Sequence, residues 1–76
     1  MKQSIIKFFK DNGFQFIERS DSNYFYYRNK HDSDIVVTIV DDTHFDIDVY
    51  DELDQKTVVK LESVTFKKVK KVLGLQ

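Results

Sequence analysis

The sequence contains no cysteine, no proline and only two glycines among its 76 residues. Without cysteine there is no disulfide, no thiolate metal site and no thiol catalysis. No apolar run approaches the ~20 residues of a membrane helix, and the N-terminus lacks a signal-peptide core. We therefore expect a cytoplasmic protein without a membrane partner. Since proline and glycine, the residues that commonly end helices and strands, are scarce, Gly13 and Gly74 are expected to mark the ends of secondary-structure elements.

Catalytic and cofactor signatures are also missing. The spacing of residues assembles no Ser/His/Asp triad, no paired general acid and base, and no glycine-rich phosphate loop. We predict no catalytic residues, no metal, no cofactor and no small-molecule substrate.

The composition nevertheless indicates a folded chain, with 41% hydrophobic and 14% aromatic residues. This length suits a single domain spanning residues 1–76. The abundance of Lys, Asp, Ile and Val, with no proline, suits a small phage- or plasmid-encoded protein of a low-GC host.

Charge is segregated along the chain, although the net charge is only −1. Residues 31–55 hold nine acidic side chains and no Lys or Arg, whereas residues 1–30 and 56–76 are each net basic. The acidic block reads as a β-hairpin. Its first strand, 35–40, consists of β-branched residues, and 44–50 alternates between Phe45, Ile47 and Val49 on one face and polar residues or tyrosine on the other.

The remaining pattern predicts an α+β domain of order α-β-β-β-β-β-α, with an antiparallel sheet of about five strands and a short helix at each terminus. We expect helices over residues 3–12 and 64–73. Strands are expected over 14–19, 24–28, 35–40, 44–50 and 56–61, with a loop over 29–34. Ser4, or a start nearer Met1, is expected to begin the first helix, and Ser63 to cap the second. If both helices cover one sheet face, the other face carries a partly apolar patch: Ile17, Tyr24, Tyr26, Val36, Val40, Tyr50 and Val58.

Three segments, IIKFFKDNGFQF, SNYFYYRN and FKKVKKVLGL, resemble the small mRNA-interferase toxins of the HicA type, which share the fold of double-stranded-RNA-binding domains. The resemblance covers about half of the chain and implies an α+β fold. The family's catalytic histidine would fall near Asn23 or Tyr24, Asp21 stands where a glycine is expected, and the acidic hairpin is extra. Ribonuclease activity is therefore not carried over. Its minimum support would be RNA cleavage that His44→Ala abolishes.

Two surfaces are candidates for binding a protein partner or a second copy. Tyr24 and Tyr26 offer large, rigid contact area with a polar tip, although they also suit packing between strands. Asp46 and Asp48, with Tyr50 beside them, form an acidic face suited to a basic partner, or to imitating a phosphate backbone and so inhibiting a nucleic-acid-binding protein. The simpler reading of this face is solubility and pairing with the protein's own lysines. His44, Asp46 and Asp48 also share a strand face, but we interpret them as the solvated face of an edge strand rather than as metal ligands.

Nucleic acid, RNA in particular, is the alternative partner. The residues concerned are Lys67, Lys68, Lys70 and Lys71, which are expected on the side of the last helix opposite Phe66, Val69, Val72 and Leu73. A solvated helix face is the simpler interpretation of these lysines. We therefore predict a small non-enzymatic interaction module acting through a tyrosine-rich sheet face and an acidic hairpin, with RNA binding as the alternative.

Overall fold

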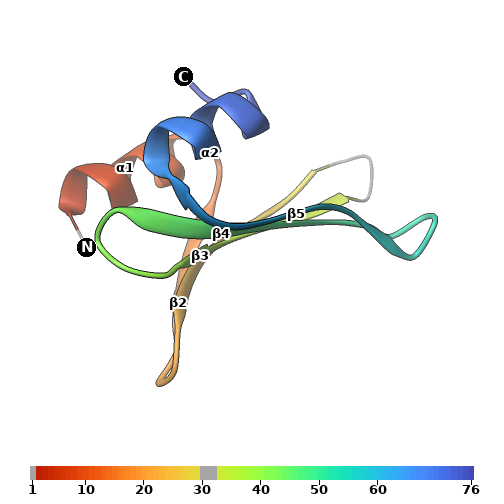
Figure 1. The fold of residues 1–76 in the computed structure, drawn as a ribbon, viewed down its shortest axis with the longest axis horizontal. Helices are drawn as coiled ribbons and strands as arrows, with labels where there is room; N and C mark the ends of the chain where they lie inside the picture. Colours follow the sequence, from red (N-terminus) through yellow and green to blue (C-terminus); the bar gives the residue numbers. More distant parts are fainter. Residues whose placement is uncertain (1, 30–32) are drawn as a thin grey trace.

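The computed structural model describes residues 2–29 and 33–76. Five strands and two helices follow in the predicted order (Figure 1). They are α1 (Gln3–Asp11), β1 (Gln15–Glu18), β2 (Asn23–Arg28), β3 (Ser33–Ile39), β4 (His44–Asp51), β5 (Lys56–Thr65) and α2 (Phe66–Leu73).

The strands form one antiparallel sheet in the order β1-β2-β3-β4-β5. Each strand pairs with its neighbour in sequence because only short polar segments connect them. The β-branched segment forms β3, the central strand, as its composition predicts. Three boundaries were predicted wrongly: β3 begins at Ser33, inside the expected loop, β5 extends four residues beyond residue 61, and α2 begins at Phe66 rather than at residue 64. Residues 30–32 of that expected loop lie outside the described part.

Both helices lie on the same side of the sheet (Figure 1). Their apolar stripes pack against the sheet face that carries Phe25, Val37, Phe45 and Ile47. At the centre, Phe9 of α1 stacks on Phe25 with a centroid separation of 4.1 Å. The core also takes the following residues from the helices and the first turn: Ile6, Phe14 and Val69. One face of the sheet is therefore covered by the helices, and the other is left open.

Neither serine caps a helix, but the alternative start of the first helix nearer Met1 is confirmed. Lys2 occupies the N-cap position of α1, and its side chain makes no capping hydrogen bond. At α2, Thr65 is the N-cap, and its hydroxyl accepts a hydrogen bond from the backbone N–H of Lys68. Ser63 instead sits in β5 with a φ of 56°, where the strand is irregular. Gly13 and Gly74 do end the helices, with φ of 89° and 67°.

The two edges of the sheet are short or distorted. β1 has four residues, and β5 shifts register twice against β4, near Val58 and near Ser63. β4 lies between β3 and β5, so the interpretation of its acidic face as the face of an edge strand is wrong. Short, bulged and charged edges resist pairing with a further strand.

Candidate interaction surface on the open sheet face

The open sheet face brings the predicted tyrosines together. Strand registers place Tyr24 between Ile17 and Thr38, and Tyr26 between Gln15 and Val36. Tyr50 lies opposite Asp34 on the neighbouring strand. All three tyrosines are half-buried, although no helix covers them, because side chains of adjacent strands shield one another. The open face is defined as the residues that the registers place on this side: Gln15, Ile17, Tyr24, Tyr26, Arg28, Asp34, Val36, Thr38, His44, Asp46, Asp48, Tyr50, Thr57, Lys60 and Thr65.

Asp46 and Asp48 lie on the β4 part of this face, as alternation along the strand predicts. Asp48 lies opposite Lys60, and its Oδ1 is 3.3 Å from the lysine Nζ. Asp46 accepts a 2.8 Å hydrogen bond from the backbone N–H of Ser63. The Asp48 pair is exposed and therefore weak, whereas the Asp46 bond serves the bulge of β5. Within the described part of the chain, no donor reaches the second oxygen, Oδ2, of either carboxylate.

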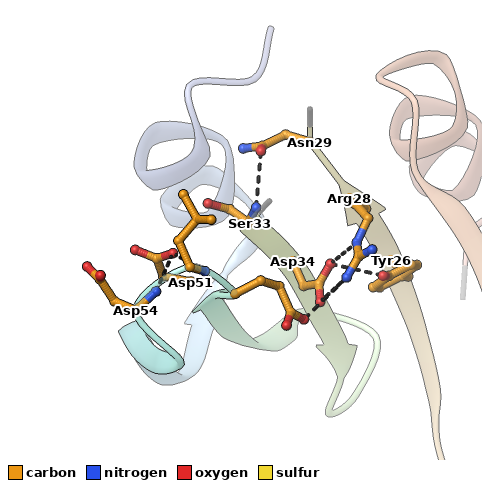
Figure 2. Close-up of polar contacts among 9 residues, drawn as sticks. Tyr26, Arg28, Asn29, Ser33, Asp34, Asp51 and Asp54 are labelled. Atoms are coloured by element: carbon orange, nitrogen blue, oxygen red, sulfur yellow. Dashed lines mark hydrogen bonds and ion pairs between the residues drawn. The ribbon is translucent and has the colours of Figure 1, made fainter. Parts of the chain in front are cut away.

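A polar cluster lies at the end of the open face where Arg28, Asp34 and Tyr50 are on adjacent strands (Figure 2). Arg28 Nε donates to Asp34 Oδ1 over 2.9 Å, and Arg28 Nη2 lies 3.3 Å from Glu52 Oε1. The Tyr26 hydroxyl donates to the same Asp34 oxygen over 3.0 Å. Because these residues come from β2, β3 and the β4–β5 turn, the cluster ties together the three segments beside Tyr50.

The cluster shifts the ionisation of its members. The hydrogen bond from Arg28 is the main reason that the pKa of Asp34 falls to about 2. The hydrogen bond to Asp34 raises the pKa of Tyr26, and the neighbouring Asp34 also raises the pKa of Glu52. At neutral pH, Asp34 is therefore charged and the Tyr26 phenol is held as a neutral donor.

His44, the first residue of β4, makes its polar contacts with the turn that precedes the strand. Its Nδ1 lies 3.1 Å from Asp41 Oδ1 and 2.9 Å from Thr43 Oγ1. Asp41 also accepts the backbone N–H of Thr43, the main reason that its pKa falls to about 2. Within residues 2–29 and 33–76, no three His, Asp or Glu side chains gather as a metal would require, and no pocket is found. His31 lies outside the described residues.

The lysines of α2 divide into two groups. Lys67, Lys68 and Lys71 are exposed, as predicted. Lys70 is half-buried, with its Nζ 5.0 Å from the ring centroid of Phe66 and 5.9 Å from that of Phe8. Its expected place on the solvated side of the helix is therefore wrong, because the ammonium group lies over two aromatic faces instead.

Charge segregation along the chain becomes segregation between layers. The two helices together hold six lysines and one carboxylate, Asp11. Residues 33–55, in the sheet and its turns, hold eight carboxylates and no Lys or Arg. Over the described residues 15–29 and 33–65, the sheet and its turns hold eleven carboxylates and four basic side chains, Arg19, Arg28, Lys56 and Lys60. The molecule therefore has a basic helix layer and an acidic sheet layer.

Sequence reasoning missed the Arg28–Asp34–Glu52 cluster, because only the strand register shows that Arg28 and Asp34 are opposite each other. No helix formed by the described residues has the length and apolar character needed to span a membrane. Comparison of the chain with protein-family models, curated proteins and solved structures finds no match.

Proposed function

We propose that this protein is a small non-enzymatic interaction module that binds a protein through its open face. The observation that carries the proposal is the placement of Tyr24, Tyr26 and Tyr50 on a sheet face that both helices leave uncovered. Tyrosine is enriched in protein interfaces because it offers large contact area, few rotatable bonds and a hydroxyl group. A monomer rarely leaves such a surface without use.

The face suits a partner better than the edges do. β1 is too short to offer a ladder of hydrogen bonds, and β5 is bulged at two places. Addition of a partner strand needs a regular free edge. A partner that contacts the side chains of the open face needs no such edge.

The composition of the face favours a partner that presents basic side chains. Asp46 and Asp48 border the aromatic part, and Asp41, Asp51 and Glu52 lie in or beside the adjoining turns. A lysine or arginine stem packs well on a tyrosine ring while its charged end reaches a carboxylate. Acidic residues around the face would also steer a basic partner to it and repel acidic proteins.

Co-purification from the native host tests this proposal. The wild-type chain should retain a stoichiometric partner that Tyr24→Ser/Tyr50→Ser loses. The matched control, Lys2→Gln/Lys10→Gln, changes only exposed lysines at α1, outside the open face and the exposed lysines of α2, and should retain the partner. Loss of the partner from the control but not from the tyrosine variant would contradict the proposal.

A second candidate is RNA binding by the basic helix layer, which the exposure of Lys67, Lys68 and Lys71 favours. Such contacts go to phosphates, so affinity should fall steeply with salt. Fluorescence anisotropy with single- and double-stranded RNA, at low and near-physiological salt, measures it. Lys67→Glu/Lys68→Glu/Lys71→Glu should abolish the binding, and salt-independent binding or no effect of this variant would contradict the candidate.

A further inference from the structure

We propose that the open face binds the exposed lysine face of α2 on a second copy of the chain, so that molecules associate head to tail. This inference rests on the proposed function of the open face and names its partner. The lysine face is defined as Lys67, Lys68 and Lys71, which α2 holds on the side away from the sheet.

The first argument is charge. The helix layer and the sheet layer carry opposite charge, yet the molecule as a whole carries only −1. Two copies therefore repel each other little at long range, and a net charge near zero favours association. The surfaces of opposite charge that two copies can bring together are the acidic layer of one copy and the basic layer of the other.

The second argument is that other pairings of two copies are poorer. Pairing through edges meets a four-residue β1 or a β5 with two register shifts. Stacking two open faces places Asp46 and Asp48 of both copies in one interface, and stacking two helix layers does the same with their lysines. Like charges brought together at an interface cost several kcal/mol.

The third argument is chemical fit. Lys67 and Lys71 are four residues apart and so lie on one side of α2. Their stems suit the rings of Tyr24 and Tyr26, which lie two residues, roughly 6–7 Å, apart on the same face of β2. Their ammonium groups suit the remaining oxygens of Asp46 and Asp48, which the registers place in the same rows as Tyr24 and Tyr26. Within one molecule, Lys70 already lies over Phe8 and Phe66, so α2 itself shows this combination of lysine and aromatic ring.

Sedimentation velocity with charge-swapped variants tests the inference. Asp46 is left unchanged because it accepts the Ser63 N–H. Thr38→Lys/Asp48→Lys makes the open face basic, and Lys67→Glu/Lys68→Glu/Lys71→Glu makes the lysine face acidic. Ser20→Lys/Asp21→Lys changes the charge by the same amount as the first variant, in the exposed β1–β2 turn. Circular dichroism of each variant verifies folding.

At low salt the wild type should exceed the 9.1 kDa monomer mass progressively with concentration, and ~0.5 M salt should reverse this because it screens charge over a few ångströms. Each face variant alone should remain monomeric, and their equimolar mixture should associate again. The Ser20→Lys/Asp21→Lys variant alone should associate like the wild type. When it is mixed with Lys67→Glu/Lys68→Glu/Lys71→Glu, the association should be no stronger than that of the wild type at high salt. A wild type that stays monomeric, or a dimer that survives either face variant, overturns the inference. If the wild type stays monomeric, the proposed function would still be supported by co-purification of a different protein that the Tyr24→Ser/Tyr50→Ser variant fails to bind.

Discussion

Arg28 and Asp34 face each other across the β2–β3 ladder, with the guanidinium Nε 2.9 Å from the carboxylate. Arg28 is half exposed, but the side chain of Asp34 is only 16% exposed. Asp34 also accepts the Tyr26 hydroxyl, and Arg28 reaches beyond β3 to Glu52. This pair therefore holds one tyrosine of the open face and connects it to the β4–β5 turn.

Asp34→Asn should make the fold less stable at neutral pH and should change its pH dependence. The pKa of Asp34 is lowered from 3.8 to about 2. A lowered folded-state pKa stabilises the fold above the unfolded pKa, here above about pH 4, and this stabilisation is lost as pH falls toward 2. The shift corresponds to about 2 kcal/mol at most. Urea unfolding between pH 2 and 7 should show the two proteins converging at the acid end, whereas a constant difference would contradict the assignment. Asp21→Asn, in an exposed turn, is the control.

Gly13→Ala should destabilise the protein more than Gly74→Ala. Both glycines have positive φ, which costs a residue with a Cβ about 1–2 kcal/mol. A Cβ at Gly13 would also lie 3.0 Å from Tyr27 Cε2, whereas one at Gly74 meets nothing within 4 Å. Thermal unfolding of both variants measures the difference. Equal losses would show that the Tyr27 ring moves aside without cost.

Asp46→Ala should cost more stability than Asp48→Ala, although the two residues share one strand face. Asp46 accepts the Ser63 N–H at 2.8 Å, and losing this acceptor should cost about 1–2 kcal/mol. Asp48 forms only an exposed pair with Lys60, worth under about 1 kcal/mol. Chemical denaturation compares them. If Asp48→Ala were the more damaging, the role given to Asp46 in the bulge would be wrong.

Lys70 and Lys71 are neighbours with different expected roles. Lys70→Gln should lower stability by about 0.5–1 kcal/mol, because its Nζ lies over Phe66 and Phe8. Lys71→Gln should leave stability nearly unchanged and weaken any salt-dependent binding of RNA or of a second copy. Thermal unfolding and anisotropy or sedimentation separate the two effects. The opposite pattern would contradict the division of the α2 lysines.

Local sequence patterns predicted the element order and the faces of most strands. The alternation around Phe45 and Ile47, the stripe of α2 and the two glycine caps are local properties, and the structure confirms each of them. Ser63 shows what local patterns miss. It is a reasonable cap by composition, but pairing with β4 keeps residues 62–65 in the strand and moves the helix start to Phe66.

The sequence predicted an open face only on the condition that both helices cover the same side of the sheet. The same alternation would fit helices on opposite sides of the sheet, in which case no open face would exist. Packing of Phe9 and Phe66 against one shared core decides the matter. The Arg28–Asp34–Glu52 cluster likewise depends on register, which composition does not specify.

Photo-crosslinking from the open face tests the central claim most directly. A benzophenone amino acid replaces Tyr24 in one variant and Lys10, exposed on α1, in the other. The claim predicts a discrete protein adduct from position 24, reduced by Thr38→Lys/Asp48→Lys, and identified by mass spectrometry as a second copy or another protein. No adduct from position 24, with a strong adduct from position 10, would contradict the claim that the open face is the protein-binding surface.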